Sequence, residues 1–140
     1  MEKKENKKVI RIIDANLNRA KEGLRVCEDV ARFVLDEPAL TRNYKKVRHQ
    51  LSTLLNGLSK DSLILTEARD IARDVGRKST RLEFKRKNIK DVFYANSQRV
   101  KESIRVLEEF TKLTHQKKAE GFKKIRYKVY SLESDVAEKL

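Results

Sequence analysis

The most regular pattern in the chain is a helical repeat of apolar positions between residues 9 and 35. With each residue advanced by ~100° around a helix, one wide arc collects the apolar side chains. They are Ile13, Leu17, Ala20, Leu24, Cys27, Ala31 and Val34, with Val26, Val30 and Phe33 at one edge. The opposite side carries Asn18, Lys21, Arg25, Glu28, Asp29 and Arg32. This pattern is typical of an amphipathic helix with one face in a core and the other in water.

The same pattern occurs a second time, 80 residues later. Residues 14–33 read DANLNRAKEGLRVCEDVARF and residues 94–113 read YANSQRVKESIRVLEEFTKL, with eight identical pairs at this offset. A shorter similarity, offset by 78, joins residues 44–49 to residues 122–127. The duplicated unit is therefore predicted to be a helical hairpin. Two copies predict an all-α four-helix bundle with approximate two-fold symmetry inside one chain.

Breakers and caps predict helices at about 9–35, 39–55, 88–114 and 117–138. Pro38 ends the first helix, because the residue before a proline avoids helical backbone, and Gly57 is suited to end the second. We expect a single domain over residues 1–140, with repeat halves at about 9–58 and 88–138. A crossover at 59–87 joins them and is expected to contain a short helix ending at Gly76 and then a basic loop.

Two pairs of polar residues interrupt the apolar arcs. Asn16 and Arg19 lie inside the first arc, and Asn96 and Arg99 repeat them in the second. A buried guanidinium needs a charged partner or an anion, since an unpaired buried charge costs several kcal/mol. We therefore predict that both arginines point inward. Either they pair with the glutamates three residues further on, Glu22 and Glu102, or they line a cleft that holds a ligand.

The densest group of charges reads RDIARDVG at residues 69–76. If this segment is helical, Arg69, Asp70 and Asp74 share a polar face. Two carboxylates four residues apart can hold Mg²⁺ together with phosphate oxygens, while a neighbouring arginine binds the phosphates. Gly76 then allows a tight turn into the basic loop at 77–87, which we expect to be mobile without ligand and to close over phosphates. The alternative is a surface helix end with ion pairs and a glycine cap.

Two further candidates lie in the second helix of each hairpin. Arg48 and Arg126 occupy equivalent places, so either could face the same cleft as the arginines of the first helices. His49, beside Arg48, either assists proton transfer or is an ordinary surface or packing residue.

Charge and composition narrow the class of partner. The formal net charge is +13, from 34 Lys and Arg against 21 Asp and Glu. Such an excess favours anionic partners, although a lysine-rich surface that maintains solubility explains it equally well. Nucleic acid is not favoured, because there is no tryptophan and the four Tyr and five Phe are placed to pack. No apolar run is long enough to span a membrane. A single cysteine fits a reducing cytoplasm.

Four blocks, at residues 11–36, 45–49, 69–76 and 95–113, together resemble one family. It is the small helical domain often fused ahead of the thiamine-phosphate synthase barrel, described as a hydroxymethylpyrimidine-phosphate kinase. The resemblance implies transfer of the γ-phosphoryl group of ATP to 4-amino-5-hydroxymethyl-2-methylpyrimidine phosphate, giving the diphosphate for thiamine biosynthesis. The alternative is a non-catalytic helical module that binds a phosphorylated pyrimidine intermediate for thiamine-phosphate synthase. A homodimer is compatible with either function.

Within this interpretation we assign roles to the residues singled out above. The predicted catalytic group is Arg69, Asp70 and Asp74, with both aspartates as Mg²⁺ ligands. The predicted substrate- and phosphate-binding group is Asn16, Arg19, Arg48, His49, Gly76, Asn96 and Arg99.

Overall fold

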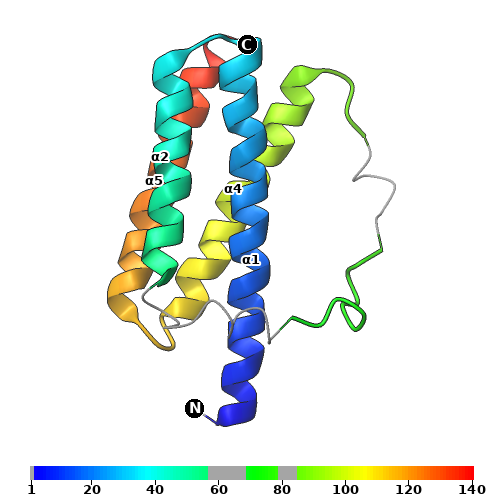
Figure 1. Ribbon diagram of the computed structural model, residues 1–140, viewed down its shortest axis with the longest axis vertical. Coiled ribbons are helices and arrows are strands. Elements are labelled where there is room, and N and C mark those ends of the chain that lie inside the picture. Colours follow the sequence, from blue (N-terminus) through cyan, green and yellow to red (C-terminus); the bar gives the residue numbers. More distant parts are fainter. Residues whose placement is uncertain (1, 57–68, 79–84) are drawn as a thin grey trace.

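The computed structural model describes residues 2–56, 69–78 and 85–140, and every regular element in this part of the chain is helical (Figure 1). The elements are α1 (Lys3–Asp29), its wider π-helical continuation η1 (Val30–Val34), α2 (Pro38–Asn56), α4 (Ile89–Thr111) and α5 (Gln116–Ala137). The four long helices lie side by side, with α1 and α5 running one way and α2 and α4 the other. The predicted all-α bundle is confirmed.

The two hairpins pack so that equivalent helices contact each other. Helix α1 contacts α4, its counterpart in the repeat, and α2 contacts α5, while α1–α2 and α4–α5 contacts hold each hairpin together. The core is a single cluster of buried apolar side chains drawn from all four helices, with Tyr44, Phe93 and Phe122 the largest fully buried members.

The two halves approach each other closely at Gly23. A Cβ added there would lie 2.6 Å from Val100 Cγ2 and 3.0 Å from the Asn96 carbonyl oxygen of α4. Only a residue without a side chain fits this crossing without a shift of its neighbours. The crossing therefore fixes how α1 is rotated, and with it the face that α1 presents outward.

The helix ends differ modestly from the predicted ones. Helix α1 begins at Lys3 rather than near residue 9, because the Lys- and Glu-rich start contains no breaker and consists of good helix formers. Pro38 is the first residue of α2 rather than a residue before it, a position where its missing N–H costs nothing. The reversal before it uses Asp36 in the left-handed region, at φ 52°. Helix α4 ends at Thr111, three residues earlier than predicted.

The predicted helix through residues 69–76 is wrong for this segment, which consists of turns. The carboxylates compete for backbone donors: Asp70 Oδ1 accepts from the N–H of Arg73 at 3.3 Å, and Asp74 Oδ1 accepts from that of Gly76 at 2.9 Å. Ile71 is 66% exposed and Val75 fully exposed, so a helix here would have no core contact to stabilise it. The part of this prediction at 61–68, and most of the loop predicted to close over phosphates (79–84), lie outside the described residues.

The prediction that Arg19 and Arg99 point inward is also wrong, since both side chains are exposed. The buried arc of α1 is rotated away from Arg19. At the edge where Arg19 lies, Phe33 is 65% exposed, and at the other edge Asp14 and Glu28 are buried. Counting Phe33 among the buried residues had extended the predicted buried face of the first helix to the side that carries Arg19.

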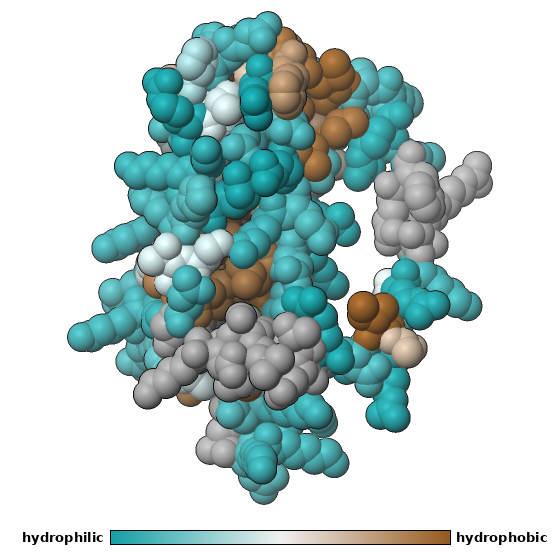
Figure 2. All heavy atoms as spheres, in the orientation of Figure 1, coloured by the Kyte–Doolittle hydropathy of each residue, from teal (hydrophilic) through white to brown (hydrophobic). Residues whose placement is uncertain are grey.

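The face shown in Figure 2 is predominantly hydrophilic, with apolar side chains gathered mainly at the upper end in that view. None of the helices in residues 2–56, 69–78 and 85–140 is both long and apolar enough to cross a bilayer.

Candidate functional site

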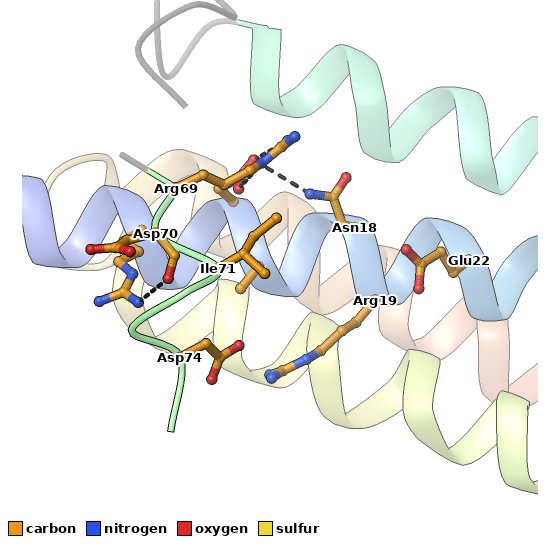
Figure 3. Close-up of a pocket in the computed structure, with 10 residues that line it drawn as sticks. Asn18, Arg19, Glu22, Arg69, Asp70, Ile71 and Asp74 are labelled. Carbon is orange, nitrogen blue, oxygen red and sulfur yellow. Dashed lines mark hydrogen bonds and ion pairs between the residues drawn. The ribbon is translucent and has the colours of Figure 1, made fainter. Parts of the chain in front are cut away.

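The first of two adjoining clefts lies between the middle of α1 and residues 69–74, and we call it the α1–loop cleft (Figure 3). Its volume of about 470 Å³ falls in the range of small-molecule sites. The lining residues are Arg11, Asp14, Ala15, Asn18, Arg19, Glu22, Arg69, Asp70, Ile71 and Asp74. The α1 residues in this set recur at helical spacing, so they form one outward face.

A bidentate ion pair fastens the crossover segment to α1. Arg69 donates from Nε to Asp14 Oδ2 at 2.6 Å and from Nη2 to Oδ1 at 2.8 Å. The Asp14 carboxylate is 4% exposed, and its hydrogen bonds and charge raise the pKa of Arg69. Asn18 Nδ2 also donates to Asp14, at 3.4 Å. A second tie runs from Arg11 Nη2 to the carbonyl oxygen of Asp70 at 2.8 Å. These contacts hold one wall of the cleft against the other.

Two guanidinium groups in this cleft keep donors for a ligand. Arg19 donates only a long hydrogen bond, 3.5 Å, to Asn16 Oδ1, and Figure 3 shows its side chain extending toward Asp74. Arg11 uses one nitrogen on the Asp70 carbonyl group. Across the described residues, neither arginine forms an ion pair with a carboxylate. Neither guanidinium group therefore has to give up a carboxylate partner in order to bind an incoming anion.

The second cleft lies between α1 and α2, and we call it the α1–α2 cleft. Its volume is about 460 Å³, and its lining is Lys21, Glu22, Arg25, Arg48, His49 and Ser52. Beneath it the buried Glu28 carboxylate pairs with Arg48 at 3.3 Å and Arg25 at 3.6 Å. Glu22 lines both clefts, so the two sites are neighbours on one face of α1.

The structure gathers most of the predicted site residues into these two clefts. The α1–loop cleft holds Arg19, Arg69, Asp70 and Asp74, and the α1–α2 cleft holds Arg48 and His49. The remaining predicted residues, Asn16, Gly76, Asn96 and Arg99, line neither.

Asn16 and Asn96 instead bond within their own helices, Asn16 to the Ile12 carbonyl at 2.9 Å and Asn96 to the Val92 carbonyl at 2.8 Å. Their repetition therefore marks equivalent positions in the scaffold. Asn16 nevertheless touches the cleft indirectly, because its side-chain oxygen accepts the bond from Arg19.

Several lining residues were missed by the sequence analysis. Arg11, Asn18 and Lys21 were grouped with the solvated surface or not singled out. Asn18 lies four residues before Glu22, and Lys21 lies four residues before Arg25. This spacing places residues on one helical face and was the available signal. Asp14 had no such signal, because its partner Arg69 lies 55 residues away.

The predicted magnesium ligands, Asp70 and Asp74, do not share a helical face, and each carboxylate accepts a different backbone N–H. Within 2–56, 69–78 and 85–140, no three His, Cys, Asp or Glu side chains gather in a group that would hold a metal ion. Binding of Mg²⁺ and of ATP stays a prediction.

A model of the ThiD2 family matches residues 11–135, which include every lining residue of both clefts. The chain belongs to the ThiD2 family. Among its curated relatives are proteins named thiamine-phosphate synthase. That of Nostoc punctiforme is 42% identical over 129 residues, covering 91% of this chain and 35% of that protein. That of Synechocystis is 41% identical over 127 residues, covering 90% and 35%. That of Rhodopirellula baltica is 38% identical over 128 residues, covering 91% and 34%.

The ThiD2 chain thus spans about a third of the length of these relatives. No solved structure matches it. The relationship to thiamine-phosphate synthase proteins implied by the resemblance is confirmed. The kinase assignment is corrected, because relatives at 38–42% identity are named for a different enzyme, a synthase rather than a hydroxymethylpyrimidine-phosphate kinase.

Proposed function

We propose that this ThiD2 chain is a helical module that binds a phosphorylated pyrimidine intermediate of thiamine biosynthesis in the α1–loop cleft. The observation that carries the proposal is the lining of that cleft. Two of its arginines, Arg11 and Arg19, form no ion pair with a described carboxylate. Its carboxylates and the Asn18 amide can accept hydrogen bonds, and one apolar side chain is exposed beside them. A ligand with an anionic end, an amino group and a flat ring uses all three.

The phosphate end of the ligand binds Arg11 and Arg19. Guanidinium groups suit phosphate because their N–H donors match pairs of phosphate oxygens, and charge-assisted bonds of this kind are about twice as strong as neutral ones. Asp14, by contrast, already occupies the guanidinium of Arg69. Arg69 therefore shapes the cleft and holds its wall, while the two other arginines bind the anion.

The pyrimidine end has apolar and polar contacts available. Ile71 is 66% exposed at the cleft and offers a surface for one face of the ring. An exocyclic amino group donates to carboxylate oxygens, and Asp70 and Asp74 supply these. The same carboxylates repel a simple anion, so the cleft favours a ligand that carries an N–H donor as well as a phosphate.

The partner that we propose is thiamine-phosphate synthase. In the relatives, a segment similar to this chain makes up about a third of a protein with that name. A module that binds a phosphorylated pyrimidine would supply or retain the pyrimidine substrate of such an enzyme.

Calorimetric titration of the purified chain tests the proposal. We expect hydroxymethylpyrimidine phosphate to bind more tightly than either the unphosphorylated alcohol or inorganic phosphate. Arg19→Gln should weaken binding of the phosphate ester by about tenfold, since it removes one charge-assisted contact. Arg99→Gln is the matched control, because Arg99 is the exposed repeat counterpart on α4 and lines neither cleft. Equal affinities for the three ligands, or equal effects of the two variants, would refute the proposal.

A further inference from the structure

The α1–α2 cleft has a counterpart in the second half of the chain, between α4 and α5, which we call the α4–α5 cleft. Its volume is about 350 Å³, and its lining is Gln98, Lys101, Glu102, Arg105, Arg126 and Tyr130. The offsets of 80 and 78 residues align its three cations with Lys21, Arg25 and Arg48 of the α1–α2 cleft. The duplication has therefore kept the same three positive charges in both halves.

In the α4–α5 cleft each of the three cations pairs with a different carboxylate. Lys101 pairs with Glu133 at 2.9 Å, and Arg105 pairs with Glu109 at 3.1 Å. Arg126 binds the buried Glu108 through two nitrogens, Nε at 3.2 Å and Nη2 at 3.1 Å. Three cations face three carboxylates, so this cleft has no surplus charge with which to attract an anion.

In the α1–α2 cleft one of these three carboxylates is missing and another is replaced by a shorter one. Leu55 stands at the position equivalent to Glu133, and Asp29 stands at that of Glu109, with a side chain one methylene shorter. In the described part of the chain, Lys21 forms no ion pair and Arg25 pairs only with Glu28. Arg25 and Arg48 therefore share the carboxylate of Glu28. Counted against Glu28 and the lining Glu22, the three cations leave the cleft with a surplus of one positive charge.

Arg48 is also held less completely than its counterpart. It reaches Glu28 through one nitrogen, at 3.3 Å, and its buried Nε has no acceptor among the described residues. A buried donor without an acceptor is unfavourable, whereas the Nε of Arg126 is satisfied. Arg48 therefore has hydrogen-bonding capacity that Arg126 has already used.

We infer that the α1–α2 cleft is a second anion site that takes a phosphate or diphosphate group, and that the α4–α5 cleft has lost this capacity. Lys21, Arg25 and Arg48 supply the charge, and His49 and Ser52 lie beside them as polar groups. The inference rests on the comparison of the two halves and does not require the ligand proposed for the α1–loop cleft.

Matched variants at equivalent positions test this inference. Arg25 and Arg105 are both more than half exposed, at 58% and 54%, so replacing either by Gln should leave the fold intact. Inorganic phosphate and inorganic diphosphate are titrated separately at low ionic strength, where exposed charges are least screened. We expect Arg25→Gln to weaken binding by about five- to tenfold and Arg105→Gln to leave it unchanged. Similar effects of both variants would show a general surface-charge effect and overturn the inference.

The reciprocal variant is Glu133→Gln, which frees Lys101 but keeps a hydrogen-bonding group beside Ser97. We expect it to add a further, weaker anion site to those of the parent chain. Unchanged stoichiometry with intact helicity would contradict the charge argument.

The two clefts are distinguished by their ligands: loss of inorganic anion binding in Arg25→Gln, with pyrimidine phosphate binding retained, assigns the effect to the α1–α2 cleft. If the parent chain binds pyrimidine phosphate but neither inorganic anion, this inference alone is overturned.

Discussion

Replacing Gly23 by alanine tests the crossing that sets the rotation of α1 and hence the position of both clefts. The new Cβ would lie 2.6 Å from Val100 Cγ2 and 3.0 Å from the Asn96 carbonyl oxygen. Val100 is completely buried, so its side chain has no free volume to move into. The carbonyl group belongs to the backbone of α4 and cannot rotate away. The variant therefore relaxes only by separating the two helices.

The expected magnitude is a difference between two opposing effects. Alanine stabilises a helix interior relative to glycine by about 1 kcal/mol. Overpacking a core typically costs about 1–3 kcal/mol, and here both a side chain and a backbone atom are too close. We expect a net loss of roughly 1–2 kcal/mol in the free energy of unfolding. For a chain of this size, that loss corresponds to a decrease in Tm of roughly 3–8 °C.

Urea and thermal unfolding followed by circular dichroism measure this change, with Gly121→Ala as the control. A Cβ at Gly121 also meets close atoms, at 2.8 and 3.0 Å, but both belong to the flexible, partly buried side chain of Leu54. Leu54 can rotate, so the higher helix propensity of alanine should prevail and stability should be unchanged or slightly higher. Equal stability of Gly23→Ala and the parent, or equal losses in the two variants, would refute the steric argument.

Three further predictions follow from buried polar groups. Asp14→Asn should release Arg69 and increase hydrogen exchange in residues 69–78 while α4 stays protected, because it removes a bidentate charge-assisted pair. Burial raises the pKa of the Cys27 thiol from 9.0 to about 12. The folded chain thus keeps a proton that the unfolded chain loses, and this contribution to stability should be complete below pH 9 and decline above it. The stability difference between the parent and Cys27→Ala should accordingly narrow on going from about pH 8 to about pH 10.5 in urea titrations. Glu108→Gln should lower the free energy of unfolding by about 1 kcal/mol more than Glu28→Gln in the same urea titrations. The reason is that Glu108 accepts two hydrogen bonds from its partner arginine and Glu28 accepts one.

The bundle could be predicted from sequence because its signals are local and repeated. Helical periodicity, Pro38 and the capping Asn88 each act within a few residues, and Asn88 does accept from the Asp91 N–H at 2.9 Å. The duplication then restricted the arrangement of the four helices. Among the four helices of the bundle, the start of α1 was misplaced most, in a stretch where no breaker marks a boundary.

The sites depend on contacts that no local pattern records. The orientation of Arg19 depends on which edge of the apolar arc is buried, and that edge is decided by the α1–α4 crossing rather than by α1 itself. The tie between Asp14 and Arg69 joins residues far apart in the chain. The conformation of residues 69–76 depends on the absence of a core surface beneath Ile71, which charge spacing alone does not reveal.

The two repeat copies share the buried carboxylate–arginine pairs of the scaffold, and they differ in the carboxylates around the candidate sites. Glu28 and Glu108 are identical, buried and paired with equivalent arginines, which is what a bundle needs wherever an arginine approaches its core. Asp14, by contrast, corresponds to Tyr94, so the second half has no carboxylate at the position that fastens the crossover segment. The acids that neutralise the α4–α5 cleft have likewise no equivalent pairing in the α1–α2 cleft. A difference of either kind alone would be ordinary drift between duplicated halves. Both lie next to the shared Glu22, on the face of α1 where Arg11, Arg19 and Lys21 form no ion pair with a described residue, and this coincidence favours a binding role for that face.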